Sequence, residues 1–189
     1  INLPKSRHID LWYHHWPISN NQLALMWNRI LHVVPSWILG PIYKLNLLIP
    51  GYEIHLVPSN SQADIDVHNL LDKYPPHLQF SPEEEKKGQT FLNKIGISDN
   101  SPFVCLIVRD SNYLEKSVPW KSWSYHDYRD CNINNYCLAA QKLTESGYYV
   151  IRMGVEVKEP FNMNNPLIID YATNGLRTEF MDIYLASKC

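Results

Sequence analysis

Charged residues follow two apolar runs in the second half of the chain, and their types suit the binding of phosphate. Arg109 and Asp110 come directly after the apolar run 103–108, and Arg152 lies near the end of a later run, just before Gly154. A guanidinium group binds phosphate oxygens through two parallel hydrogen bonds. Arginines that converge on one rim would offset the charge of a diphosphate. We therefore predict a substrate-binding set in which Asp110 and Gly154 lie beside the two arginines.

A second cluster follows in the long polar and aromatic segment between the two runs. It comprises His126, Asp127, Tyr128 and Arg129, just before a predicted helix N-terminus, where backbone amides favour anions. Tyr128 belongs to a group of aromatic side chains that could stack on a base or a sugar ring. The alternatives are that these aromatic residues anchor the loop to the core, and that Arg129 pairs with Asp130 or caps the helix.

The order of elements in this half predicts a Rossmann-like parallel sheet. The continuous apolar run 103–108 is typical of a strand buried on both faces. Helical spacing predicts helices at 133–143 and 176–184, and further apolar runs predict strands at 148–153 and 167–171. Strand–helix–strand connections give right-handed parallel crossovers. Ligands bind beyond the carboxyl ends of such strands, which is where the charged residues lie.

The first half shows a looser alternation of short elements. The residues Ser81, Pro82 and Glu84 form a strong helix start, and that helix should run to Ile95 as a connection between two domains. Upstream, the patterns predict strands at 9–14 and 53–57, helices at 21–31 and 61–74, and an irregular segment at 35–52.

Composition excludes several classes of protein. With 189 residues, 45% hydrophobic and 12% aromatic, the chain is too apolar to be disordered, and its net charge of −2 lacks the basic excess of a nucleic-acid binder. No uninterrupted run approaches the roughly 20 apolar residues of a membrane-spanning helix, although peripheral membrane contact stays open. Four cysteines without metal-ligand spacing predict reduced thiols and a cytoplasmic location. Asp64 and Asp66 suit a helix start better than a metal site, so we predict no metal and no cofactor.

Several motifs occur in an order that resembles a family of bacterial glycosyltransferases associated with surface-polysaccharide clusters. They are Phe103–Ser111, His126–Asp130, Gly147–Gly154, Asp170–Ala172 and Asp182–Leu185, with weaker matches at Asn21, Met26–Trp27 and Phe80–Glu85. The resemblance implies a GT-B-like fold of two Rossmann-like halves, both incomplete in this chain. Residues 1–80 would be the later part of an acceptor-side domain, 81–96 a connecting helix, and 97–189 the first part of a nucleotide-sugar domain. We expect the chain to be a piece of a longer protein that is inactive alone.

The implied activity is sugar transfer from a nucleotide-sugar donor to the hydroxyl of a glycan or lipid-linked acceptor. Arg109 and Arg152 would offset the charge of the leaving diphosphate. His126 and Asp127 would contact the donor or transfer a proton, since an imidazole titrates near neutral pH. Two alternatives remain: a nucleotide-sugar epimerase of the same fold, and a non-catalytic module that binds carbohydrate or protein.

Overall fold

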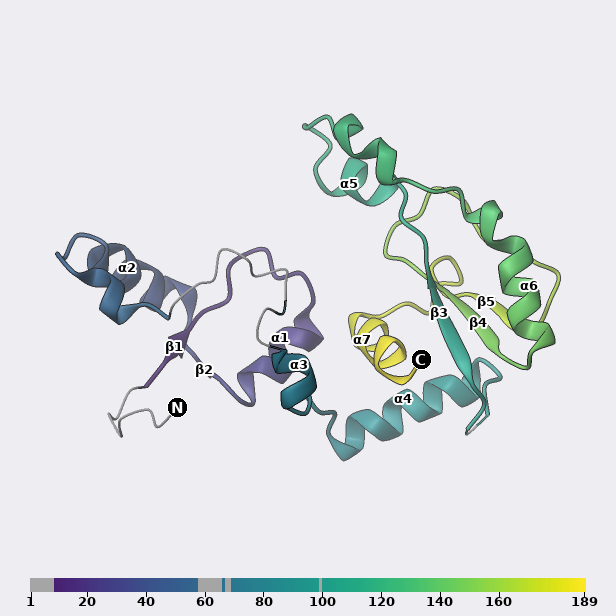
Figure 1. Cartoon of the computed structure of the whole chain (residues 1–189), viewed down its shortest axis with the longest axis horizontal. Coiled ribbons are helices and arrows are strands. Elements are labelled where there is room, and N and C mark those ends of the chain that lie inside the picture. The colour runs from purple at the N-terminus through teal and green to yellow at the C-terminus, as the bar shows by residue number, and fades with distance from the viewer. Residues whose placement is uncertain (1–8, 58–65, 67–68, 99) are drawn as a thin grey trace. The chain divides into compact units, whose positions relative to one another are not determined.

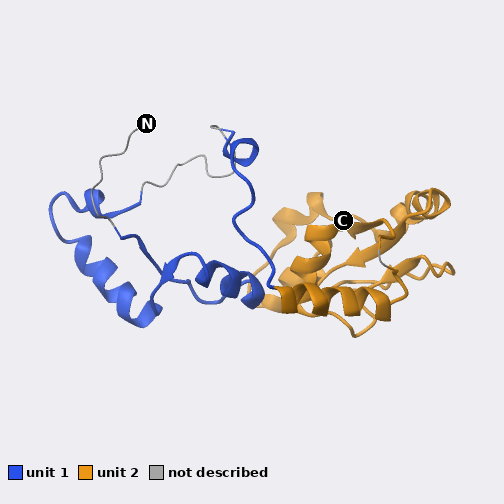
Figure 2. Cartoon of the chain, turned by 90° about the horizontal axis from the view of Figure 1, so that it is seen from below, with its two compact units in different colours: residues 1–81 blue, residues 82–189 orange. Residues whose placement is uncertain are grey.

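The computed structural model describes residues 9–57, 66, 69–98 and 100–189. It has mixed α/β structure with two small parallel sheets, which confirms the predicted α/β class. The chain divides into two compact units, residues 1–81 and 82–189 (Figure 2).

The second unit is built on a three-stranded parallel sheet with the strand order β3–β4–β5 (Figure 1). Helix α6 lies on one side of this sheet and α7 on the other (Figure 1). The elements, in chain order, are α4 (Pro82–Lys94), β3 (Phe103–Ile107), α5 (Asn112–Ser117), the 3-10 helices η2 (Ser124–Arg129) and η3 (Ile133–Tyr136), α6 (Cys137–Glu145), β4 (Tyr149–Met153), β5 (Ile168–Asp170) and α7 (Glu179–Lys188).

The core of this unit lies on the central strand β4. Val150 and Ile151 are fully buried, one facing each side of the sheet by the alternation of a strand. A cluster of buried residues packs on the α6 side: Val108, Ile133, Ala140, Val150, Phe161 and Ile168. The prediction that β3 is buried on both faces is wrong in part. It is an edge strand, and its last residue, Ile107, is exposed.

Helices α4 and α7 pack together through a close approach that requires glycine. A Cβ atom added to Gly88 would lie 2.1 Å from Cζ of Tyr184, so the tyrosine ring rests directly on the α4 backbone. The Lys188 ammonium adds an ion pair with Glu85 at 2.8 Å. The helix predicted to start at Ser81 and Pro82 is present as α4, and it packs against α7, the last helix of the second unit.

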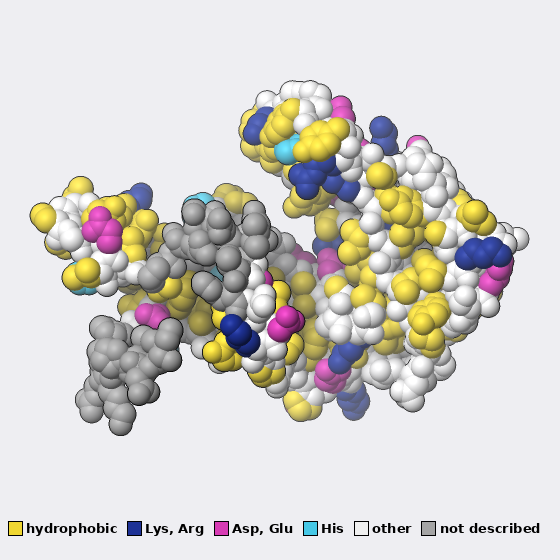
Figure 3. Space-filling model, in the orientation of Figure 1, with side chains coloured by type: hydrophobic (Ala, Val, Ile, Leu, Met, Phe, Trp, Pro, Cys, Tyr) yellow, Lys and Arg dark blue, Asp and Glu magenta, His cyan; other side chains and the backbone are white. Residues whose placement is uncertain are grey.

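The first unit contains much less regular structure. Two-residue strands pair in parallel, and the Asn20 side chain caps the first helix by accepting from Leu23 N at 2.9 Å. The elements are β1 (Leu11–Trp12), α1 (Asn21–Asn28), β2 (His32–Val33), α2 (Ser36–Asn46), the 3-10 helix η1 (Tyr52–His55) and α3 (Leu70–Lys73). Apolar side chains remain exposed along α2 (Figure 3), and Met26 is the one buried apolar side chain among the described residues of this unit.

Two predictions for the first unit are wrong. The segment 35–52 is not irregular, because α2 occupies Ser36–Asn46 and contains Pro41 within the helix. Proline removes one hydrogen bond, and the apolar residues around it still favour a helix. The segment 53–57 is not a strand, because η1 occupies it after a left-handed turn at Gly51. Of the predicted helix 61–74, the structure shows α3, and much of the rest lies outside the described residues.

None of the helices in the described parts of the chain has both the length and the apolar character needed to cross a membrane.

Candidate functional site

The loops after β3 and β4 enclose a cavity of about 210 Å³ at the carboxyl edge of the second-unit sheet. We call it the edge cavity. Three of the predicted substrate-binding residues, Arg109, Asp110 and Gly154, are brought together in its wall. The complete lining is Val108, Arg109, Asp110, Tyr113, Leu114, Gly154, Val155, Glu156 and Val157.

Arg109 brings a guanidinium group to this cavity. Its Nε lies 3.4 Å from an oxygen of Asp130, and its backbone carbonyl accepts from Cys131 N at 2.9 Å. The side chain is one-third exposed. No described residue accepts a hydrogen bond from its two terminal nitrogens, so these donors are available to a ligand. The partner of Asp130 is thus Arg109 and not the neighbouring Arg129.

Asp110 holds the two loops of the edge cavity together. One carboxylate oxygen accepts from Asn112 N at 3.0 Å, and the other accepts from Lys158 N at 2.9 Å. The Asn112 side chain also donates to the Val157 carbonyl at 2.9 Å. These bonds join the loop after β3 to the loop after β4. Asp110 therefore shapes the cavity, and its charge is offset by backbone donors.

Arg152 does not line the edge cavity. Its side chain is 1% exposed, and it donates to Asp170 at 3.1 Å and to the Glu159 carbonyl at 3.2 Å. Asp170 also accepts from Phe161 N at 2.8 Å and from the Thr173 hydroxyl at 2.6 Å. The two arginines therefore do not converge on one rim, because Arg109 reaches the cavity and Arg152 holds together the segments behind it.

The hydrogen bonds around Asp170 also affect its ionisation. Burial opposes the charge and would raise the pKa, but the donors of Thr173, Phe161 and Arg152, with the charge of the arginine, outweigh it. The pKa of Asp170 therefore lies below its usual value, and the carboxylate is charged whenever the unit is folded at neutral pH.

The cluster His126, Asp127, Tyr128 and Arg129 forms most of η2, in a projection that extends from the sheet together with α5 (Figure 1). These four residues do not line the edge cavity, and they do not line the second cavity that shares Asp110 with it. The His126 ring packs 4.0 Å from the ring of Tyr125 and is stacked at 6.0 Å on Trp123. Its Nδ1 atom is buried without a hydrogen-bond partner, whereas Tyr128 is 83% exposed.

A neighbouring cavity of about 230 Å³ shares Asp110 with the edge cavity. It is lined by Asp110, Ser111, Asp130, Cys131, Asn132, Lys158 and Glu159. Lys158 supplies a positive charge that the sequence argument missed, as it missed Tyr113 in the edge cavity. The sequence did contain a signal for Lys158. Residues that follow a parallel strand lie at the same sheet edge as the last residue of that strand, and Lys158 comes shortly after β4.

No three His, Cys, Asp or Glu side chains among the described residues are arranged to hold a metal ion. Asp64, the first member of the acidic pair noted in the sequence, lies outside those residues.

Comparisons of the chain with known protein families, with curated proteins and with solved structures found no match.

Proposed function

We propose that the chain contributes the nucleotide-sugar side of a glycosyltransferase of GT-B-like architecture. In this proposal the enzyme works at the cytoplasm and transfers a sugar to a hydroxyl of a glycan or lipid-linked acceptor. The observation that carries the proposal is Arg109, whose terminal nitrogens are available beside a cavity at the carboxyl edge of a parallel sheet. Open α/β sheets hold their ligands at this edge.

The size of the edge cavity indicates which part of the donor it would hold. Its volume of about 210 Å³ lies below the ~300–1,000 Å³ of typical small-molecule sites. It therefore suits the diphosphate part of a nucleotide-sugar better than the whole molecule. Arg109 would offset the charge that develops on the leaving diphosphate when the acceptor hydroxyl displaces it. Lys158, at the neighbouring cavity, takes the role of second cation that the sequence had assigned to Arg152.

The roles of the η2 residues remain predictions within this proposal. His126 and Asp127 are proposed to take part in proton transfer, and Tyr128 and Arg129 to contact the nucleotide or sugar. Support comes from the exposed Tyr128, which presents an open aromatic face, and from the position of η2 in the segment that follows the first strand of the sheet.

Titration of the 189-residue chain with GDP, UDP, CMP and dTDP, with and without magnesium, tests the proposal. A ligand that binds the folded state raises the melting temperature. We expect one nucleotide to stabilise the chain without metal, and Arg109→Ala to weaken its binding by at least about tenfold, as expected for loss of a charge-assisted contact of roughly 1.5–3 kcal/mol. Lys142→Ala removes one exposed positive charge on α6 and should leave the affinity unchanged. Equal affinity of the wild type and Arg109→Ala would refute the phosphate role.

A second candidate function is a non-catalytic module that binds carbohydrate or protein through the projection formed by α5 and η2. It is favoured by Trp120 and Tyr128, which are 82% and 83% exposed there. Such a module would show no melting-temperature shift with any nucleotide. The nucleotide-sugar epimerase is distinguished by its products, since it would convert the donor without any acceptor present.

A further inference from the structure

The first unit contains a cavity of about 350 Å³ that belongs neither to the edge cavity nor to its neighbour. We call it the tryptophan cavity. It lies beyond the carboxyl ends of β1 and β2: His14 comes two residues after β1, and Val34 to Trp37 follow β2 directly. The complete lining is His14, Trp16, Ile18, Asn28, Val33, Val34, Pro35, Ser36 and Trp37.

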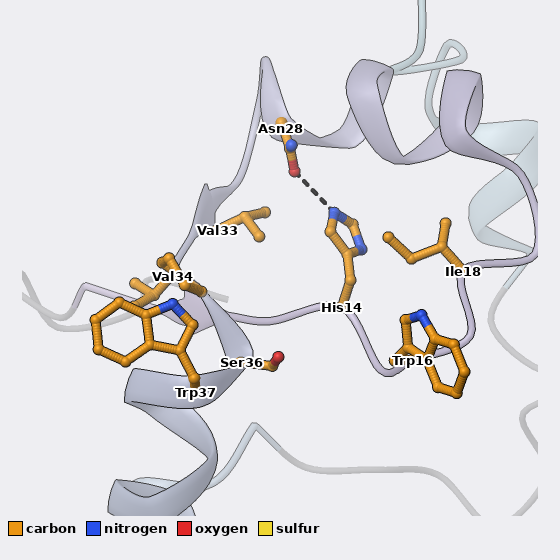
Figure 4. A pocket seen from close by; sticks show the side chains of 9 residues that line it. His14, Trp16, Ile18, Asn28, Val33, Val34, Ser36 and Trp37 are labelled. Carbon is orange, nitrogen blue, oxygen red and sulfur yellow. Dashed lines mark hydrogen bonds between the residues drawn. The ribbon is translucent and has the colours of Figure 1, made fainter.

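Two tryptophans present open faces at this cavity. Trp16 is 80% exposed and Trp37 is 76% exposed, although tryptophan normally buries most of its large apolar surface. Figure 4 shows them on opposite sides of His14, one on the segment after β1 and the other on the first turn of α2. An exposed indole has a flat apolar face that can cover the C–H face of a ring.

Polar groups of the cavity are held in place with hydrogen-bonding capacity left over. His14 Nε2 and Asn28 Oδ1 are 2.8 Å apart (Figure 4), and because an amide oxygen carries no hydrogen, the imidazole donates. In the neutral ring Nδ1 is then an acceptor, while Asn28 Nδ2 is a donor and the Ser36 hydroxyl is both. Within the described ranges, none of these three groups has a further hydrogen-bond partner.

The charges around the cavity restrict the kind of ligand. Among the described residues, its lining includes no lysine, arginine, aspartate or glutamate, whereas Arg109 lines the edge cavity. A phosphate or carboxylate would enter without a cationic side chain to offset its charge, and a cation would enter without a carboxylate. A neutral ligand with one apolar ring face and a rim of hydroxyls matches the two indoles and the mixed donors and acceptors.

We infer that the tryptophan cavity is a binding site for a neutral hexose, free or as a unit of a glycan. The ring stacks on Trp16 or Trp37, and its hydroxyls exchange hydrogen bonds with His14, Asn28 and Ser36. The inference rests on residues of the first unit alone, and it stands whether or not the second unit binds a nucleotide.

Indole N–H signals in a proton–nitrogen NMR spectrum of the whole chain test the inference. The probes are the methyl glycosides of glucose, galactose, mannose and N-acetylglucosamine, with glucuronic acid as the charged comparison. At least one neutral glycoside should shift the Trp16 and Trp37 signals in a saturable way, and glucuronic acid should not. The two signals are assigned with Trp16→Phe and Trp37→Phe.

Substitutions then separate this site from other exposed aromatic surface. Removal of the indole on which the ring stacks, by Trp16→Ala or Trp37→Ala, should weaken binding by about tenfold or more, and Ser36→Ala should weaken it by a smaller factor. Trp120→Ala is the matched control, because that indole is 82% exposed but lies in the second unit. Three results would overturn the inference: no signal shift with any neutral glycoside, signal shifts confined to Trp120, or an equal loss of glycoside affinity in all three tryptophan variants. Each variant is shown to be folded if the indole signals of its unsubstituted tryptophans keep their wild-type chemical shifts.

Discussion

The two units of the chain place cavities at the carboxyl ends of parallel strands, but they support them very differently. In the second unit the edge cavity rests on a sheet whose central residues, Val150 and Ile151, are fully buried. In the first unit the tryptophan cavity lies beside two-residue strands, and Met26 is the one buried apolar side chain described there. The second unit therefore supports its cavity with a packed core and a buried ion pair, whereas the first unit supports its cavity with local contacts.

The substitution expected to destabilise the second unit most is the one that removes the carboxylate bound by Arg152. Asp170→Ala leaves a guanidinium that is 1% exposed without its charged partner. Loss of one member of a buried ion pair costs about 3–5 kcal/mol, so the free energy of opening of the second unit should fall by that order. Amide hydrogen exchange of β4 measures it. The control Lys142→Ala breaks an exposed pair and should cost less than about 1 kcal/mol. Equal costs would refute the structural role of Arg152.

A core truncation compares the units directly. Ile151→Ala removes a fully buried side chain and should lower the stability of the second unit by roughly 2–5 kcal/mol. Leu48→Ala, at a position 79% exposed in the first unit, should change stability by less than about 0.5 kcal/mol. Urea unfolding of the two variants, followed by far-ultraviolet circular dichroism, provides the measurement. A large loss for Leu48→Ala would show that the first unit packs more apolar surface than the structure indicates.

Acid should weaken the second unit through the same ion pair, with a smaller effect. The pKa of Asp170 is lower in the folded chain than in the unfolded chain, where an aspartate titrates near pH 4. The charged carboxylate therefore stabilises the fold at pH values above about 4, and this stabilisation is lost as the pH falls through the lower folded-state pKa. The neutral variant Asp170→Asn lacks the contribution at every pH. The stability gap between wild type and variant should therefore begin to narrow below about pH 5 and continue to narrow as the pH falls through the depressed pKa of Asp170. A gap that stays constant with pH would contradict this assignment.

The second unit follows closely from its sequence, because short continuous apolar runs bounded by turn signals favour strands of a parallel sheet. The predicted strands 148–153 and 167–171 enclose β4 and β5, and the helical spacing at 133–143 and 176–184 overlaps α6 and α7. The edge position of β3 was not predictable, since strand order depends on which long-range pairings form. The first unit was less predictable, because α2 contains a proline inside the helix and because short elements depend on their neighbours.

The candidate site was predictable in position but not in detail. The rule that ligands bind at carboxyl edges correctly brought Arg109, Asp110 and Gly154 together. Arg152 follows two buried residues in β4. Its side chain is held away from the cavity by a hydrogen bond to Asp170, 18 residues further along the chain. Spacing alone cannot show such pairing. Similarly, only the folded chain shows that His126 packs against the rings of Trp123 and Tyr125 and lines neither cavity.

Hydrogen exchange of the whole chain, with and without the nucleoside diphosphate that stabilises it most, tests the central claim most directly. If the edge cavity is the phosphate site, protection should appear at residues 108–114 and 154–158, and Arg109→Ala should reduce it at the same nucleotide concentration. Protection confined to the first unit or to η2, or no protection by any of the four nucleotides, would contradict the claim.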